Sequence, residues 1–128
     1  MSEHLIADFY GCETEKLCDA QFIETTLVRA VEFLGATILE KCTRNYSPKG
    51  VTAVLVLAES HISAHTWPER GYAALDIYTC GDRTTKQAYE FLETAFHPQQ
   101  SRAMIVNRGP EIRDGDFEVM ELDQISRG

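Results

Sequence analysis

The sequence predicts an α+β two-layer sandwich in which an antiparallel sheet carries two helices on one face. Strand-like segments follow one another in runs joined by short turns, and only two segments have the spacing of amphipathic helices. No repeat or low-complexity tract divides the 128 residues, so we expect a single domain over residues 1–128. The face of such a sheet that lacks helices is left for a partner.

The first strand and the first helix have clear sequence signals. Residues 4–10 alternate, with the apolar side chains on one face, which is typical of a strand. Asp19 is a candidate N-cap for a helix that runs to about Leu34, and Gly35 fits the C′ position after it. The apolar residues that recur at helical spacing in this segment are Ile23, Leu27, Ala30, Val31 and Leu34.

Two further strands are expected next, over residues 36–45 and 51–58, joined by a turn at 47–50. The second of them is rich in Val and Leu, which indicates a buried strand. The polar and aromatic stretch that follows, up to Trp67, has no clear periodicity, and a turn is expected at 68–71.

The second half of the chain adds the other helix. Residues 72–79 alternate as a strand, with Ala73, Leu75 and Ile77 on one face. A helix over residues 84–96, followed by Pro98, would direct inward the side chains of Ala88, Phe91, Leu92, Ala95 and Phe96. Residues 104–106 and 117–122 are short candidate strands.

Composition excludes several classes of function. The 20 acidic and 12 basic residues give a net charge of -8, which argues against binding to nucleic acid or to an anionic membrane surface. The N-terminus lacks the pattern of a signal peptide, so a cytoplasmic location is expected. The cysteines show no CxxC spacing and predict free thiols rather than a zinc site. Cys12, Cys18 and Cys42 are expected to act as small hydrophobes.

Taken one at a time, the polar residues between 57 and 81 have ordinary structural interpretations. Ser60 could be a strand-end hydroxyl, Glu69 a solvated turn residue and Cys80 a structural thiol. His61 and His65 are four residues apart, but the segment has no helical pattern and lacks the glutamate of the zinc-protease motif. No metal is therefore expected.

Taken together, these residues carry a resemblance. The elements Glu-Ser-His, His-Thr-Trp-Pro-Glu, Gly-Tyr-Ala and Thr-Cys-Gly occur in order within 57–81, after an opening His-Leu-Ile-Ala-Asp-Phe-Tyr-Gly-Cys. The chain thus resembles the small prokaryotic S-adenosylmethionine decarboxylases, which are pyruvoyl-dependent enzymes of spermidine biosynthesis, over roughly residues 3 to 96.

The resemblance implies a proenzyme that cuts its own chain between Glu59 and Ser60. The Ser60 hydroxyl attacks the Glu59 carbonyl and converts the amide into an ester. β-Elimination then breaks the ester and leaves dehydroalanine, which water hydrolyses to a pyruvoyl group with loss of ammonia. The products would be chains 1–59 and 60–128, the second blocked by the cofactor. That group would form a Schiff base with the substrate amine and act as an electron sink for decarboxylation.

Residue roles follow from the same resemblance. His65 matches the family histidine of processing, where an imidazole suits removal of the Ser60 Cα proton. Thr52 stands where the family normally has a serine whose hydroxyl supports processing, and it keeps the hydroxyl. Cys80 matches the acid that returns a proton to the former α-carbon.

The resemblance also implies the substrate contacts. Tyr46 stands where the family places an aromatic residue, usually Phe, that stacks on adenine, and Glu69 matches the acid that binds the ribose hydroxyls. Trp67 either lines the pocket or packs in the core. The family forms homodimers of the processed two-chain unit, with residues from both protomers at each site, so we expect the same partner here.

Departures from the family pattern cluster beside the substrate half of the site, at Arg44, Tyr46, Thr52 and Ala53. Two alternatives therefore stay open at this point. One is a pyruvoyl-dependent decarboxylase of ornithine or arginine, substrates that lack adenine. The other is a catalytically silent homologue that is never processed, although Ser60, His65 and Cys80 are all intact.

Overall fold

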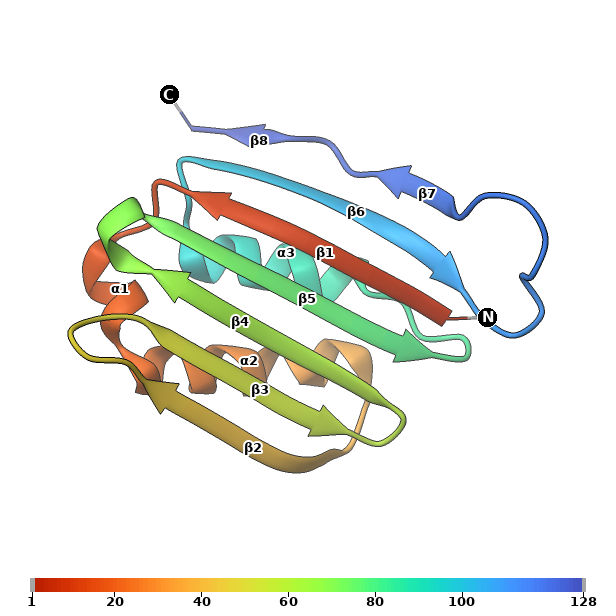
Figure 1. The fold of residues 1–128 in the computed structure, drawn as a ribbon, viewed down its shortest axis with the longest axis horizontal. Helices are drawn as coiled ribbons and strands as arrows, with labels where there is room; N and C mark the ends of the chain where they lie inside the picture. The colour runs from red at the N-terminus through yellow and green to blue at the C-terminus, as the bar shows by residue number, and fades with distance from the viewer. Residues whose placement is uncertain (1, 128) are drawn as a thin grey trace.

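Eight strands form one antiparallel sheet in the computed structural model, which describes residues 2–127. The strand order is β2-β3-β4-β5-β1-β6-β7, and β8 also pairs with β6 (Figure 1). The strands are β1 (Ser2–Tyr10), β2 (Ile38–Asn45), β3 (Val51–Leu57), β4 (Ser60–Trp67), β5 (Tyr72–Cys80), β6 (Gln100–Arg108), β7 (Glu118–Glu121) and β8 (Ile125–Ser126).

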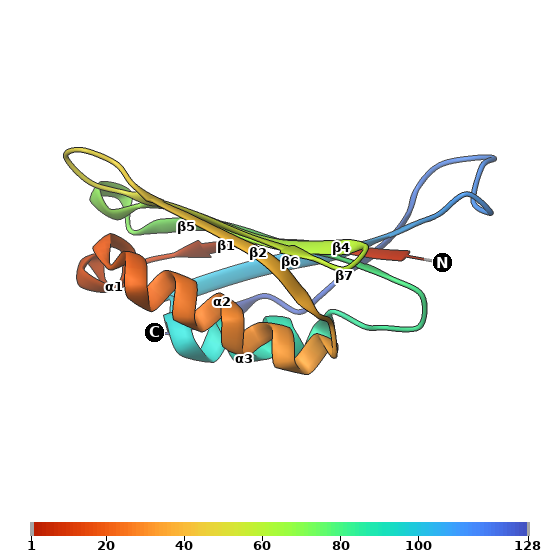
Figure 2. The same ribbon diagram turned by 90° about the horizontal axis from the view of Figure 1, so that it is seen from below.

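Both long helices lie on the same face of this sheet and leave the other face open (Figure 2). They are α2 (Ala20–Leu34) and α3 (Lys86–Phe96). A short helix, α1 (Thr14–Cys18), and a 3-10 turn, η1 (Pro68–Arg70), complete the described elements. The predicted α+β fold with two helices on one face of an antiparallel sheet is confirmed, and α1 is an addition to it.

The boundaries of α2 follow from its caps. The Phe22 N–H donates to Asp19 Oδ1 at 3.0 Å, which satisfies one of the free amides of the first turn. Gly35 ends the helix with φ of 66°, a left-handed conformation that glycine adopts without a Cβ clash. Both predicted ends of the first long helix are confirmed.

The core lies between the sheet and the two helices. Alternate side chains of each central strand point into it, while the residues between them face the open side. Its largest fully buried side chains include Leu5, Phe9, Leu17, Ile23, Leu27, Leu55, Ile62, Ile77, Leu92 and Phe96.

Two strand predictions need correction. The segment that ends at Trp67 is a full central strand, β4. The sequence shows little strand periodicity there because the inward-facing Ser60 and Thr66 are polar. β3 is buried on one face only, because no second layer covers the other, and Val56 stays 42% exposed there. Because apolar residues also lie on its open face, the sequence of β3 resembles that of a strand buried on both faces.

The buried face of α3 is rotated from the predicted one. Phe91 and Ala95 are only partly buried, whereas Tyr89 and Glu93 are buried. The Glu93 carboxylate is paired with the guanidinium of Arg127, with Nη2 and Oε1 2.9 Å apart. This ion pair holds the segment after β8 against α3. Sequence periodicity could not predict it, because the two residues lie 34 positions apart.

The cysteines differ from one another more than expected. Cys12 is buried, and burial raises the pKa of its thiol to about 11. Cys18 and Cys42 are exposed, so the expectation that they act as core hydrophobes is wrong. No helix within residues 2–127 has the length and apolar character needed to cross a membrane.

Candidate active site

The predicted site residues form two groups at opposite ends of the sheet. The first group is Glu59, Ser60 and Cys80, where the short turn from β3 to β4 meets the end of β5. The second group is Thr52, His65 and the aromatic and acidic residues near η1. In Figure 1 the β3–β4 turn and the segment between β4 and β5 that contains η1 lie at the two ends of β4.

Ser60 begins β4 with its side chain buried on the helix side of the sheet. Within residues 2–127, its Oγ is a buried side-chain oxygen for which no hydrogen-bond partner is present. A buried hydroxyl in that state is costly to maintain in a purely structural role. Its lone pairs are therefore free for a reaction.

Glu59, the residue before Ser60, has φ of 62°. This left-handed conformation costs a residue with a Cβ about 1 kcal/mol relative to ordinary backbone. Strained backbone of this kind concentrates at functional sites. The bond predicted to be cut therefore lies in a strained two-residue turn.

Cys80 lies directly at this turn. Its Sγ–H donates to the Glu59 carbonyl oxygen, with 2.8 Å between the two atoms. That hydrogen bond polarises the carbonyl that the Ser60 hydroxyl would attack. The structure thus brings Glu59, Ser60 and Cys80 together at one turn.

Thr52 and His65 form the second group on the open face. They are direct neighbours in the ladder between β3 and β4, and Thr52 Oγ1 is 3.0 Å from His65 Nδ1. The Thr52 methyl group does not prevent this contact. The predicted processing pair is therefore assembled with its hydroxyl and imidazole in hydrogen-bond contact.

The predicted substrate residues lie at the same end as His65. Tyr46 follows β2 and is 49% exposed, while Glu69 lies in η1. Trp67 is 41% exposed and stacks on Tyr72, with ring centroids 5.3 Å apart, so the alternative that Trp67 packs in the core is wrong. Tyr46 and Trp67 thus offer exposed aromatic faces, and Glu69 lies in η1, two residues after Trp67.

Tyr72 supports that aromatic cluster. Its hydroxyl donates to Asp8 Oδ1 at 2.6 Å. Burial, together with the hydrogen bond to Asp8 and its charge, raises the pKa of Tyr72 to about 12. The phenol therefore stays protonated and keeps its ring fixed under Trp67.

One protomer does not bring the two groups into contact. Ser60 and His65 are five residues apart on the same strand, which separates them by roughly 16 Å. Their side chains also lie on opposite faces of the sheet, because side chains alternate along a strand and the two positions differ by five. A cavity of about 560 Å³ on the open face is lined by His65 and Asp76 but not by Ser60 or Cys80.

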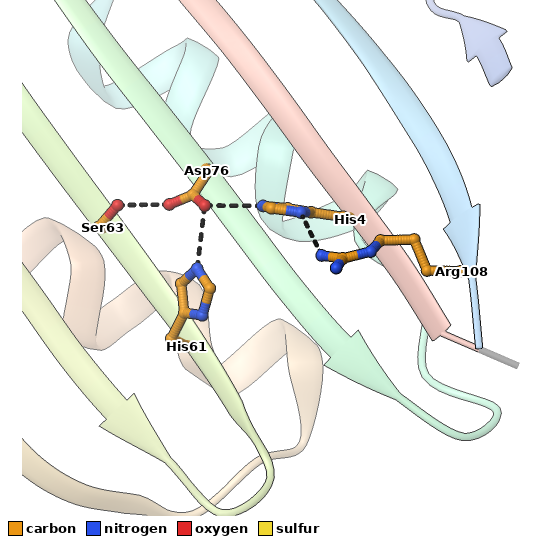
Figure 3. Close-up of polar contacts among 5 residues, drawn as sticks. All are labelled: His4, His61, Ser63, Asp76 and Arg108. Atoms are coloured by element: carbon orange, nitrogen blue, oxygen red, sulfur yellow. Dashed lines mark hydrogen bonds and ion pairs between the residues drawn. The ribbon is translucent and has the colours of Figure 1, made fainter. Parts of the chain in front are cut away.

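The structure adds a polar network that the sequence interpretation missed. Asp76 Oδ2 is 2.7 Å from His4 Nε2 and 2.9 Å from His61 Nε2, and Ser63 donates to the other carboxylate oxygen (Figure 3). Burial alone would raise the pKa of Asp76, but these hydrogen bonds outweigh it and hold that pKa well below its ordinary value. The alternation of β4 and β5 places these side chains on one face, but only the strand register shows that they meet.

This network is built for hydrogen bonding rather than for a metal. The ligand atoms of His4, His61 and Asp76 lie within 4.8 Å of one another. Arg108 Nη1, which can only donate, lies 3.1 Å from His4 Nδ1, so the proton of neutral His4 is on the Nε2 that faces Asp76. A metal would need that nitrogen free. His61 and His65 are about 13 Å apart along β4 and cannot share an ion.

Comparison with known proteins gives a consistent result. Residues 3–109 match the family model described as S-adenosylmethionine decarboxylase. The chain is 44% identical over 117 residues to a Methanococcus maripaludis protein named S-adenosylmethionine decarboxylase proenzyme, covering 91% of this chain and 95% of the relative. A protein of the same name from Prochlorococcus marinus is 48% identical over 93 residues, covering 72% of this chain and 74% of the relative.

Solved structures share the fold. The crystal structure of the adenosylmethionine decarboxylase from Aquifex aeolicus superposes with a TM-score of 0.81 at 32% identity, covering 91% of this chain and 97% of that one. A Trypanosoma brucei AdoMetDC monomer matches with a TM-score of 0.60 at 16% identity, covering 81% of this chain and 45% of that one. The second likeness concerns the fold alone.

Proposed function

The chain belongs to the S-adenosylmethionine decarboxylase family, and from this premise we propose that it is a pyruvoyl-dependent decarboxylase of S-adenosylmethionine. In this proposal the chain is a proenzyme that cuts itself between Glu59 and Ser60 into residues 1–59 and 60–128. Its product, decarboxylated S-adenosylmethionine, serves spermidine biosynthesis. The enzyme works in the cytoplasm, where its unpaired thiols stay reduced.

The observation that carries the proposal is the arrangement at the turn before β4. Ser60 Oγ is buried and has no hydrogen-bond partner among the described residues, Glu59 is strained, and Cys80 donates to the Glu59 carbonyl at 2.8 Å. An acyl shift from nitrogen to oxygen requires a nucleophile, a strained bond and a hydrogen-bond donor to the developing oxyanion.

The same residues fit a pyruvoyl group formed from Ser60. Ser60 Oγ is buried and has no hydrogen-bond partner within residues 2–127, so loss of this oxygen would break no hydrogen bond there. When present, the group supplies an electron sink for loss of carbon dioxide. Cys80 then lies one strand away with an S–H group that can deliver a proton, and no metal is needed for these steps.

Substrate binding is proposed for the exposed residues near η1. Tyr46 would stack on the adenine ring and can approach the sulfonium charge with its face. Glu69 would accept hydrogen bonds from the ribose hydroxyls. Trp67, held on Tyr72, would line the same pocket.

The proposal includes a homodimer in which two open faces pack together. The distance of roughly 16 Å between Ser60 and His65 excludes a complete site within one protomer. An antiparallel pairing of two sheets would set the Ser60 end of one protomer against the His65 end of its partner. Exposed apolar side chains on the open face, among them Ile6 and Val56, suit burial in such an interface.

The first test is a denaturing mass spectrum of the purified chain, followed by assays with labelled amino-acid substrates. We expect two fragments divided after residue 59, the second lighter than a serine-started chain by the loss of ammonia. The cut protein should release carbon dioxide from S-adenosylmethionine. Release from ornithine or arginine instead would change the substrate, and an intact 14.4 kDa chain would refute the proposed processing.

A mixing experiment tests the shared site. Ser60→Ala and His65→Ala chains, each expressed alone, should stay uncut, since each dimer lacks one of the two groups. When the two are co-expressed, the His65→Ala chain should be cut, because the end of β4 that carries its intact Ser60 lies against the intact His65 of its partner. Mass spectrometry identifies the cut chain. If co-expression yields no fragments while wild type is fully cut, the two groups do not meet across an interface.

A further inference from the structure

We propose that Asp76, acting through His61, is the clamp that holds the new chain start in place after the bond between Glu59 and Ser60 is cut. This inference rests on the proposed function and goes beyond it, because it gives a positioning role to residues that take no part in the cleavage itself. The clamp consists of Asp76 and Tyr78 on β5 and of His61 on β4.

Cleavage would remove the covalent link between β3 and the start of β4. The turn between β3 and β4 contains only Ala58 and Glu59, and the last pair of the ladder is Leu57 with Ser60. After the cut, residue 60 is a chain end with no covalent link to β3. As a pyruvoyl group it also has no backbone N–H to donate. Free strand ends of this kind fray unless other contacts hold them.

His61 is the first side chain after that new end, and it is anchored to an uncut strand. Its Nε2 is 2.9 Å from Asp76 Oδ2, and its ring stacks on Tyr78 with centroids 5.9 Å apart and planes 23° apart. Both partners belong to β5. Cutting the turn leaves all of these contacts in place.

The Asp76 carboxylate is itself held firmly. His4 from β1 donates through Nε2 at 2.7 Å, and Arg108 from β6 fixes the His4 tautomer from behind at 3.1 Å (Figure 3). Ser63 donates to the second carboxylate oxygen. Side chains from the two strands that flank β5 thus converge on one carboxylate, whose side chain is 23% exposed.

The position of the clamp matters because of Cys80. Asp76, Tyr78 and Cys80 alternate along one face of β5, and Cys80 contacts the Glu59 carbonyl at the cut. The distance from residue 60 to the thiol therefore depends on how the start of β4 lies against β5. Misplacing a reacting group by about 1 Å can cost roughly 100-fold in rate.

Histidines on either side of Asp76 provide a matched test. His61→Leu removes the hydrogen bond that reaches Asp76 Oδ2 from β4, the strand that is cut. His4→Leu removes the hydrogen bond of similar length that reaches the same oxygen from β1, which is not cut. We expect both variants to be cut. His61→Leu should lose roughly 10- to 100-fold in turnover per cut site, as expected for a hydrogen bond to a charged group. His4→Leu should lose much less, and His61→Gln, which keeps a donor near Nε2, should recover most of the turnover.

Hydrogen exchange supplies a readout independent of turnover. In the cut protein, amides at the start of β4 should exchange faster in His61→Leu than in His4→Leu. In the uncut Ser60→Ala background the same comparison should show little difference, because the turn still holds the strand.

Two outcomes would overturn the clamp. Equal losses in His4→Leu and His61→Leu would make the network merely structural, and a His61→Leu chain that stays uncut would place His61 in the cleavage step. An uncut wild-type chain would instead refute the proposed function, so the two failures are distinguishable.

Discussion

Ser60→Ala should leave the protein as one intact chain of 14.4 kDa with no measurable decarboxylation. The substitution removes the hydroxyl that is proposed to attack the Glu59 carbonyl, and with it the source of the cofactor. Because Ser60 Oγ makes no hydrogen bond within residues 2–127, its removal should not destabilise the fold. Loss of both cleavage and turnover, with a thermal unfolding midpoint no lower than that of wild type, is therefore the expected result.

The control for this prediction is Ser63→Ala. Ser63 lies three residues later on the same strand and faces the open side, where its hydroxyl donates to Asp76. That variant should still be cut after residue 59. A Ser60→Ala chain that divides at the same bond would show that another group performs the attack.

Cys80→Ala should separate the two stages of the reaction. Cleavage should continue but slow down, because the thiol that donates to the Glu59 carbonyl at 2.8 Å is lost while Ser60 remains. Turnover per cut site should fall about 100-fold or more, the usual contribution of a positioned general acid. The extent of cleavage is measured by mass spectrometry, and turnover is measured on the cut fraction.

Two further substitutions serve as controls for this result. Cys80→Ser keeps a hydroxyl donor at the same place and should recover part of both rates. Cys42→Ala removes an exposed thiol on β2, far from the turn, and should behave as wild type. Wild-type turnover in cut Cys80→Ala would show that the proton comes from another group.

Much of the fold could be predicted because its signals are local. The alternation of residues 4–10, the Asp19 cap and Gly35 depend on neighbours within a few positions, and the structure confirms them. β4 was missed because two of its four inward-facing residues, Ser60 and Thr66, are polar, so the sequence shows too little apolar alternation to indicate a strand. Glu93 on α3 was missed because its partner, Arg127, lies 34 residues later.

The sequence by itself determined the chemical groups at the proposed cleavage site and their order along the chain. Glu59 and Ser60 are adjacent by covalent bonding, and Thr52 and His65 lie within one hairpin, so short-range pairing is enough to bring each pair together. These local relations also carry the family resemblance.

Only the tertiary structure decided which groups meet across strands. The register between β4 and β5 brings His61 to Asp76, and the end of β5 brings Cys80 to Glu59. It also places Ser60 and His65 on opposite faces at opposite ends of one strand. The physical reason is that a strand fixes distance along itself at about 3.3 Å per residue, whereas contacts across a sheet depend on register and alternation, which the whole fold sets.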